Sequence, residues 1–255
     1  MTTTLLIKWM YGLAAAVLVV TVLTFWAHLG YFYLFFEDEY VQYNNPSVAV
    51  VTVRGPLDLV SDPTRGQVDA SLVAGEIQRH SRNPDVEVIV LDIYSYGGKG
   101  VAGEMVMNAL KRSPKKTIAL LNENVISTGY LAATGADEIY ASRFTTVGGI
   151  GVTSSYVNES GQNMREGREF VGVSSAPFKN LYNPYKPLTQ AGRVEMQRVV
   201  DELHELFVAT VAENRGLGIE TVTELATGAS FLPEEALEYG LIDGIGDMQL
   251  VLDRF

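Results

Sequence analysis

The stretch EVIVLDIYSYGGKGVAGEMVMNALKR, residues 87–112, predicts the repeating unit of the fold. Its first seven residues form a nearly continuous apolar run, which is typical of a strand covered on both faces. A glycine-containing turn follows, and from Val101 to Arg112 apolar residues recur three and four positions apart, which predicts a helix. Strand, turn and helix in this order indicate part of a βαβ unit in a parallel sheet.

The same alternation continues on both sides of this unit. Apolar runs at 48–54 and 117–121 predict two further strands, and helical spacing at 71–82 predicts a helix between the first two strands. A long amphipathic helix is expected after Thr189, a residue type that favours the N-cap position. We therefore predict an α/β fold for residues 47–255.

The composition excludes several classes of protein. The 255 residues include no cysteine, which excludes a disulfide framework, a thiolate nucleophile and a zinc site built on sulfur. The net charge of -11 argues against nucleic-acid binding, because phosphate contacts depend on clustered Lys and Arg. We expect no metal ion, no cofactor and no nucleic-acid partner.

The N-terminal segment differs from the rest in composition. Residues 9–36 carry no charged side chain, and about 20 apolar residues suffice for a transmembrane helix. Lys8 precedes this run and Glu37 follows it, so residues 1–8 are expected in the cytoplasm and the following domain outside it. The expected protein is anchored in the cell (inner) membrane, with 37–46 as a tether; a cleaved signal peptide is the alternative.

One glycine motif permits a nucleotide-binding interpretation. GKGVAG, residues 98–103, fits G-x-G-x-x-G after a strand, and Glu123 lies where a ribose-binding acid would be expected. However, a strand and a helix precede this turn, and the chain after it is short for a second nucleotide-binding half plus a substrate domain. The dinucleotide interpretation is therefore the weaker alternative.

A second interpretation assigns the same glycines to an oxyanion site. Gly97 and Gly98 end a buried strand, where backbone N–H groups can approach a reacting carbonyl. Ser127 follows the next strand at the start of a small-residue helix, where the helix dipole favours developing negative charge. Ser127 is thus a candidate nucleophile, although a serine in this place commonly serves only as an N-cap.

A serine nucleophile needs a base, and imidazole is an unconvincing choice here. His80 lies on a polar helical face, His204 lies within the long helix, and His28 falls in the apolar N-terminal run, so none suggests a Ser-His-Asp triad. Lys179 is flanked by small and apolar residues in SSAPFKNLYNP. Such surroundings favour the neutral amine, so Lys179 is the candidate general base.

The order and spacing of several motifs resemble those of the signal peptide peptidase A family, which are membrane-anchored Ser-Lys proteases. The resemblance covers SYGG (95–98), STGYLAATGADEIYA (127–141), VGGIGV (147–152), PFKNLYNPYKPLT (177–189), VAENRGL (211–217) and FLPEEALEYGLIDGIG (231–246). It implies a Clp protease/crotonase-like fold of repeated ββα/βαβ units. It also implies that Ser127 is the nucleophile, Lys179 the base and Gly97/Gly98 the oxyanion site, in a homo-oligomeric ring that cleaves apolar, membrane-derived peptides such as remnant signal peptides.

Three positions depart from the family pattern. The family usually has Pro where this chain has Tyr96, Gly where it has Thr128, and a lysine-supporting serine where it has Gly149. Thr146 or Thr153 is a candidate for that supporting role. The sequence thus predicts a membrane-anchored serine endopeptidase; the alternatives are a catalytically impaired, peptide-binding scaffold and a dinucleotide or acyl-thioester enzyme.

Overall fold

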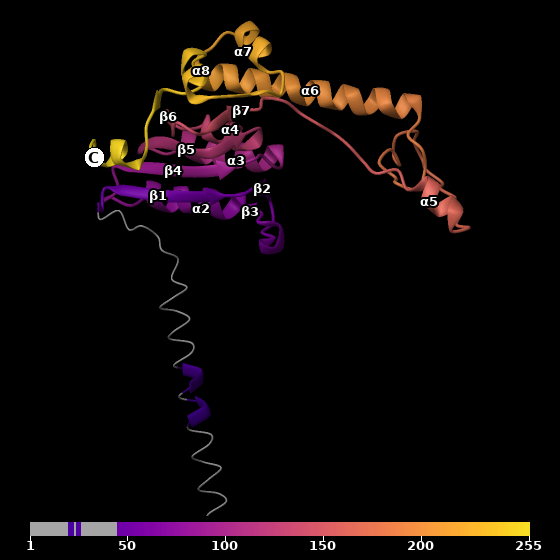
Figure 1. Cartoon of the computed structure of the whole chain (residues 1–255), viewed down its shortest axis with the longest axis horizontal. Coiled ribbons are helices and arrows are strands. Elements are labelled where there is room, and N and C mark those ends of the chain that lie inside the picture. The colour runs from indigo at the N-terminus through magenta and orange to yellow at the C-terminus, as the bar shows by residue number, and fades with distance from the viewer. Residues whose placement is uncertain (1–19, 23, 27–44) are drawn as a thin grey trace, which may run out of the picture. The chain divides into compact units, whose positions relative to one another are not determined.

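A parallel β-sheet forms the centre of the domain in the computed structural model, which describes residues 20–22, 24–26 and 45–255 (Figure 1). The strands of the main sheet are β1 (Val48–Arg54), β4 (Val88–Ser95), β5 (Lys116–Ile126), β6 (Glu138–Ala141), β7 (Thr146–Gly148), β8 (Ser230–Phe231) and β9 (Gly244–Ile245). Their order is β1-β4-β5-β6-β9, with β7 beside β5 and β8 beside β7. All pairs are parallel except β7 with β8. The predicted α/β fold with a parallel sheet is confirmed.

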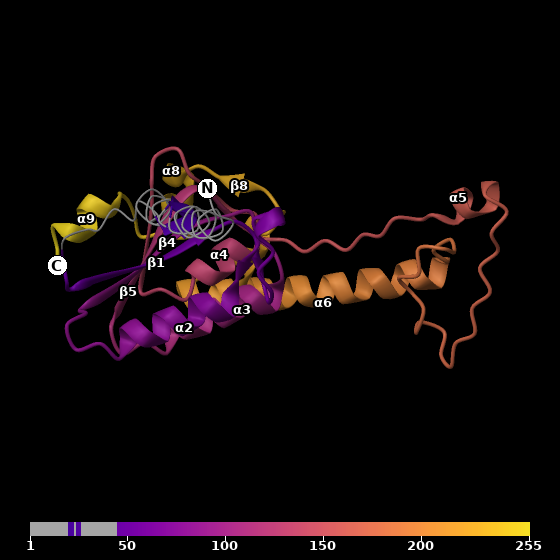
Figure 2. The ribbon, with the colours of Figure 1, turned by 90° about the horizontal axis from the view of Figure 1, so that it is seen from below.

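The helices connect these strands and cover the sheet. They are α2 (Ala70–Ser81), α3 (Gly100–Lys111), α4 (Thr128–Ala133), α5 (Ser160–Arg165), α6 (Gln190–Arg215), α7 (Ile219–Leu225), α8 (Pro233–Glu238) and α9 (Met248–Leu252). A separate pair of short parallel strands, β2 (Leu57–Asp58) and β3 (Val68–Asp69), lies between β1 and α2 in the chain. Figure 2 shows α2 and α3 side by side.

The core lies between one face of the sheet and these helices. Alternate residues of β1 and β4, among them Val51 and Leu91, belong to this core together with Ile77 of α2, Val106 of α3 and Tyr130 of α4. Side chains two positions apart on a strand point to the same face, so one face of each strand enters this core. Removing these apolar surfaces from water stabilises the fold.

Strand β5 changes its pairing partner near its carboxyl end. It pairs with β6 through Ile118–Leu121 and then with β7 through Asn124–Ile126. Its register with β4 shifts beyond Ile93, and Glu123 in this irregular stretch has a positive φ of 59°. The shift bends β5 toward β7, and this bend determines where the residue after the strand, Ser127, is presented.

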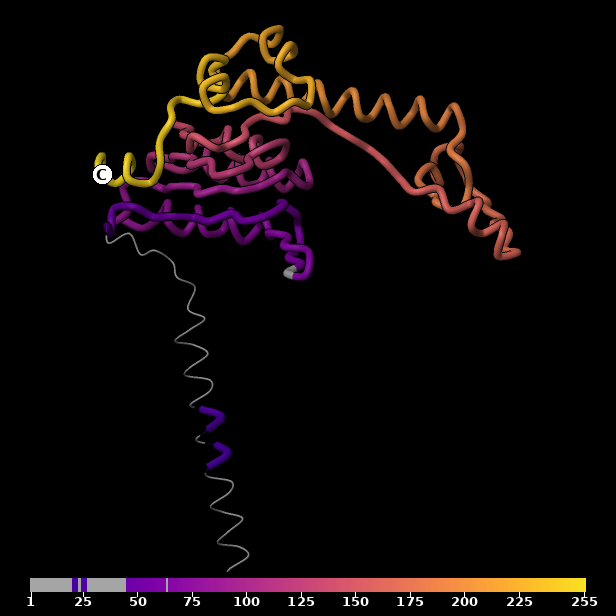
Figure 3. Tube along the Cα trace, viewed as in Figure 1, coloured from indigo at the N-terminus to yellow at the C-terminus, as the bar shows by residue number. Residues whose placement is uncertain are grey.

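Residues 153–189, which we call the arm, extend away from the sheet (Figures 1 and 3). The arm connects β7 with α6 and includes α5. Its hydrogen bonds among the described residues join parts of the arm to one another or to the start of α6, for example Glu159 N to Pro184 O at 2.7 Å. Helix α6 begins after the predicted N-cap Thr189. Its residues that enter the core, among them Phe207, Val208 and Val211, lie in its second half, whereas Gly192 and Met196 are buried near its start, where the arm joins it.

The predicted membrane anchor and the location derived from it require correction. Among the described residues, no helix is long and apolar enough to cross a membrane. Within the predicted span 9–36, the structure describes residues 20–22 and 24–26, and these are helical. The prediction of a single-pass membrane protein with a cytoplasmic N-terminus is therefore wrong. The rest of 9–36, residues 1–8 and most of the tether 37–46 lie outside the described residues.

The chain divides into two compact units, Met1–Asn45 and Pro46–Phe255. Only six residues of the helical part of the first unit, together with Asn45, are described. The sheet, the helices α2 to α9 and the arm all belong to the second unit. All structural arguments below concern residues of this second unit.

Tyr130 links α4 to the C-terminal part of the chain through its hydroxyl. Loss of this hydroxyl should destabilise the fold. The buried Tyr130 hydroxyl donates to Leu241 O at 2.7 Å, and burial raises the pKa of Tyr130. Tyr130→Phe leaves that buried carbonyl without its donor, which is expected to cost about 1–3 kcal/mol of the free energy of unfolding. Tyr239→Phe is the control, because this ring is 37% exposed. Chemical denaturation of both variants checks the prediction, and equal losses would contradict it.

Candidate active site

The turn at Gly97 and Gly98 is held in place by close backbone contact with β2. Leu57 N donates to Gly97 O at 2.8 Å, and Lys99 N donates to Leu57 O at 2.8 Å. Both glycines have positive φ angles, 121° and 136°. A Cβ on Gly98 would lie 2.0 Å from Leu57 O, so only glycine fits this position.

Ser127 joins β5 to α4 in a backbone conformation that is unusual for a residue with a side chain. Its φ is 52° and its ψ is −128°. Its N–H donates to Gly148 O at 2.8 Å, which ties it to β7. Its hydroxyl makes no capping hydrogen bond to α4. The interpretation of Ser127 as only an N-cap therefore fails, and such strained residues are concentrated at functional sites.

The glycine turn and Ser127 lie against each other. A Cβ on Gly97 would be 3.0 Å from Ser127 Cβ and 3.2 Å from Ser127 Oγ. The Thr128 hydroxyl donates to Gly98 O at 3.2 Å, so the threonine that departs from the family pattern fastens α4 to the turn. Two of the sequence-predicted elements, the glycine turn and the candidate nucleophile, are thus brought together.

The backbone donors near Ser127 differ partly from those expected. Gly97 N–H donates to Ser95 Oγ at 3.2 Å and is occupied. Within the described part of the chain, the N–H groups of Gly98 and Thr128 have no hydrogen-bond acceptor. Sequence reasoning missed the Thr128 N–H, although its position directly after a candidate nucleophile at a helix start was a usable signal.

Lys179 lies on the arm and is exposed to solvent, whereas Ser127 directly follows β5 of the central sheet. The Lys179 side chain forms no hydrogen bond or ion pair with another described residue. The apolar neighbour Phe178 is itself 45% exposed. The expectation that these neighbours shield the amine is therefore not met within one copy of the chain, and the two proposed dyad residues are not brought together there.

Thr146 and Thr153, the two residues predicted to support Lys179, form no hydrogen bond with it. The Thr146 hydroxyl donates to Asn124 Oδ1 at 2.7 Å, and Thr153 is exposed at the start of the arm. Gly149, where the family has a serine, has a φ of 57°, and a Cβ there would approach Ile126 Cβ to 2.9 Å. The backbone at this position therefore disfavours any side chain.

The glycine motif 98–103 is explained by packing. A Cβ on Gly103 would lie 2.5 Å from Thr128 Cγ2 and 2.7 Å from Thr128 O, so this glycine lets α3 approach α4. Gly98 accommodates Leu57, as described above, and Gly100 has open space around it. Packing thus accounts for Gly98 and Gly103 without a dinucleotide, but not for Gly100.

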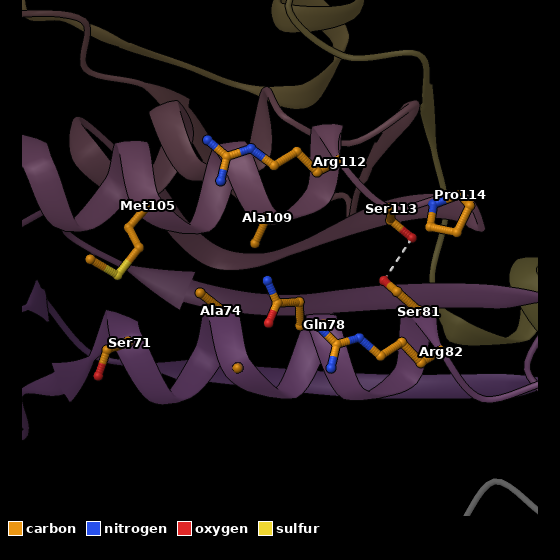
Figure 4. Close-up of a pocket in the computed structure, with 11 residues that line it drawn as sticks. Ser71, Ala74, Gln78, Ser81, Arg82, Met105, Ala109, Arg112, Ser113 and Pro114 are labelled. Carbon is orange, nitrogen blue, oxygen red and sulfur yellow. Dashed lines mark hydrogen bonds between the residues drawn. The ribbon is translucent and has the colours of Figure 1, made fainter.

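A cavity of about 520 Å³ lies away from these residues, between α2 and α3 (Figure 4). Its lining includes Gln78, Arg82, Met105 and Arg112, and Ser81 and Ser113 hydrogen-bond at 3.0 Å at its edge. None of the sequence-predicted site residues lines it. Within the described residues, no group of three or more His, Asp or Glu side chains is placed to hold a metal ion.

Two solved protease structures have a similar fold. A mutant of the membrane-bound stomatin-specific protease 1510-N aligns with a TM-score of 0.53 at 17% identity, over 81% of this chain and 83% of that chain. ClpP1 from Listeria monocytogenes aligns with a TM-score of 0.50 at 15% identity, over 79% of this chain and 92% of that chain. At these identities, the similarity establishes the fold.

The chain belongs to peptidase family S49, whose sequence model matches residues 109–255. A putative signal peptide peptidase SppA of Enterococcus faecium is 29% identical over 70% of this chain and 53% of its own length. A putative protease of Methanocaldococcus jannaschii is 27% identical over 68% of this chain and 56% of its own length. The predicted family resemblance is confirmed, and the chain spans about half the length of these curated relatives.

The contact between Gly97 and Ser127 gives a test of the site. Gly97→Ala adds a Cβ at a positive φ and 3.0 Å from Ser127 Cβ, so it should displace Ser127 and abolish labelling by a serine-directed fluorophosphonate. Gly100→Ala is the matched control, because nothing lies within 4 Å of its new Cβ. We expect the control to label as the wild type does. Equal labelling of both variants, measured on folded protein, would contradict this account of the turn.

Proposed function

We propose that this chain is a serine endopeptidase in which Ser127 is the nucleophile and Lys179 the general base. The observation that carries the proposal is the conformation of Ser127, strained and uncapped, beside the unoccupied N–H groups of Gly98 and Thr128. Membership of peptidase family S49 supports the reaction class. Ser95, the serine that precedes the glycine turn, has its hydroxyl hydrogen-bonded to Gly97 O.

The proposed reaction proceeds through an acyl-enzyme. Lys179 Nζ accepts the proton of Ser127 Oγ as that oxygen bonds to the substrate carbonyl carbon. The resulting oxyanion accepts hydrogen bonds from the N–H groups of Gly98 and Thr128. The ammonium group then donates its proton to the departing amine as the C–N bond breaks. Lys179 Nζ, again neutral, then deprotonates a water molecule that hydrolyses the ester. This step releases the carboxylic acid product and Ser127.

The base is supplied by a neighbouring copy of the chain in this proposal. Lys179 lies on an arm that makes its hydrogen bonds within itself or with the start of α6. The arm also exposes many large apolar side chains: Val157, Met164, Phe170, Val171, Val173, Phe178, Tyr182 and Tyr185. Extended apolar surface of this kind marks an interaction site. In this proposal the arm of one copy contacts the sheet of the next copy, and such head-to-tail contacts close into a ring. The Clp-like fold supports this assembly.

The proposed substrates are extended apolar peptides, such as remnant signal peptides. Beyond β7, Gly149 N donates to Ala229 O and Gly228 N donates to Ile150 O, so this short segment has one side paired. An extended peptide can add to a free strand edge through backbone hydrogen bonds, which presents its scissile bond. Substrate side chains then enter pockets that select them.

Variants of the two dyad residues test the base and its origin together. Ser127→Ala and Lys179→Ala should each abolish hydrolysis of an apolar reporter peptide. Co-expression of both variants should restore roughly a quarter of the activity, because random neighbours in a ring then combine an intact serine with an intact lysine. Lys186→Ala, on the same arm, is the matched control and should remain active.

Two results would contradict this scheme. Hydrolysis retained by either folded single variant would exclude the dyad. Absence of any recovery on co-expression, with wild-type activity intact, would exclude a lysine contributed by a neighbour. A folded wild type that binds apolar peptides without cleaving them would instead favour the peptide-binding scaffold, which the glycine at position 149 makes the second candidate.

The arm offers a separate test of assembly. Val173 is 98% exposed, so Val173→Asp should leave the stability of a single copy nearly unchanged. A charge in an apolar contact is costly, so the variant should dissociate at concentrations where the wild type assembles, and should lose peptidase activity with it. Leu72→Asp, on α2 and 68% exposed, is the control. Sedimentation velocity measures the outcome, and unchanged assembly would exclude this contact.

A further inference from the structure

Tyr96 is an exposed aromatic residue whose ring is nonetheless fixed. Its side chain is 56% exposed, although it directly precedes Gly97. The ring packs edge-on against Tyr94, with centroids 5.5 Å apart and an interplanar angle of 73°. Its hydroxyl accepts a hydrogen bond from Asn124 Nδ2 at 3.2 Å. A ring held at both its edge and its hydroxyl cannot turn freely into solvent.

The contacts of Tyr96 continue across the sheet. Asn124, which binds the Tyr96 hydroxyl, accepts from Thr146 Oγ1 at 2.7 Å and lies opposite Thr146 in the pairing of β5 with β7. The hydrogen bond with Tyr96 raises the pKa of Tyr94 to about 12, so the Tyr94 hydroxyl remains neutral near physiological pH. The Tyr96 ring therefore presents a fixed surface beside the carboxyl end of β4.

This surface lies close to the candidate nucleophile. Gly97, the next residue, approaches Ser127, and Asn124 is three residues before Ser127 along β5. Three extended residues span at most about 10 Å. A peptide with its scissile bond at Ser127 and an extended backbone would bring a side chain within one to three residues of that bond to the ring.

We propose that Tyr96, supported by Tyr94, forms the wall of a substrate subsite that takes a large apolar or aromatic side chain near the scissile bond. This inference rests on the proposed peptidase function and adds a determinant of its specificity. A substrate side chain that packs on the exposed face of Tyr96 buries apolar area. The entropic cost is small because the tyrosine ring is already fixed.

The peptide preference of the enzyme shows whether Tyr96 contacts the substrate or only stabilises the local structure. Reporter peptides carrying Ala, Leu or Phe at each position near the cleaved bond are compared in the wild type, Tyr96→Ala and Tyr96→Phe. For Tyr96→Ala we expect kcat/KM to fall roughly tenfold or more for Phe or Leu at one position and little for Ala there. Tyr96→Phe keeps the ring and should keep the preference. A uniform loss across all peptides, or no change, would overturn the subsite.

A binding measurement separates this inference from the proposed function. Ser127→Ala cannot form an acyl-enzyme, so fluorescence anisotropy with labelled Phe- and Ala-containing peptides reports recognition alone. Adding Tyr96→Ala to this variant should weaken binding of the Phe peptide and spare the Ala peptide. If the wild type cleaves no peptide yet this selective loss is observed, the peptidase proposal fails and the subsite stands. Equal binding of both peptides in both variants would refute the subsite.

Discussion

The backbone of Ser127 is the constraint on which the rest of the site depends. A positive φ at a residue with a Cβ costs of order 1–3 kcal/mol and persists only where the surroundings impose it. Here the bond to Gly148 O fixes one side of Ser127, and the bend in β5 fixes its approach from the strand. Packing of Tyr130 against the core fixes the helix that follows. The strain aims a hydroxyl away from its own helix, and that freedom distinguishes a nucleophile from a cap.

Close backbone approach explains why glycine recurs around this serine. Gly97 makes room for Ser127, Gly98 for Leu57, and Gly103 for Thr128, so three elements of secondary structure meet with little side-chain volume between them. Gly98 and Gly103, together with Gly100, also satisfy the spacing of a dinucleotide motif, which is a statement about sequence only. Spacing alone cannot distinguish glycines that admit a phosphate from glycines that admit a neighbouring strand or helix.

The sequence predicted what depends on local pattern. Apolar runs predicted β1, β4 and β5, and the N-cap residue Thr189 predicted the start of α6. The assignment of Ser127 as the nucleophile stays a prediction. The unoccupied Thr128 N–H was missed because every residue carries a backbone donor and only tertiary structure shows which are free. The surroundings of Lys179 were misjudged because apolar neighbours in sequence bury an amine only if the segment packs, and the arm is largely exposed.

The separation of Ser127 from Lys179 has a consequence for how such an enzyme would be controlled. If the base comes from a neighbouring copy, an isolated chain holds an uncapped serine without a partner to deprotonate it. Its alcohol is then a weak nucleophile at neutral pH. Assembly would supply the base and cover the apolar arm in the same step, so the hydrophobic contact that stabilises the ring would also complete the active site. A peptidase built in this way would be inert while dilute and would cleave only inside its own assembly.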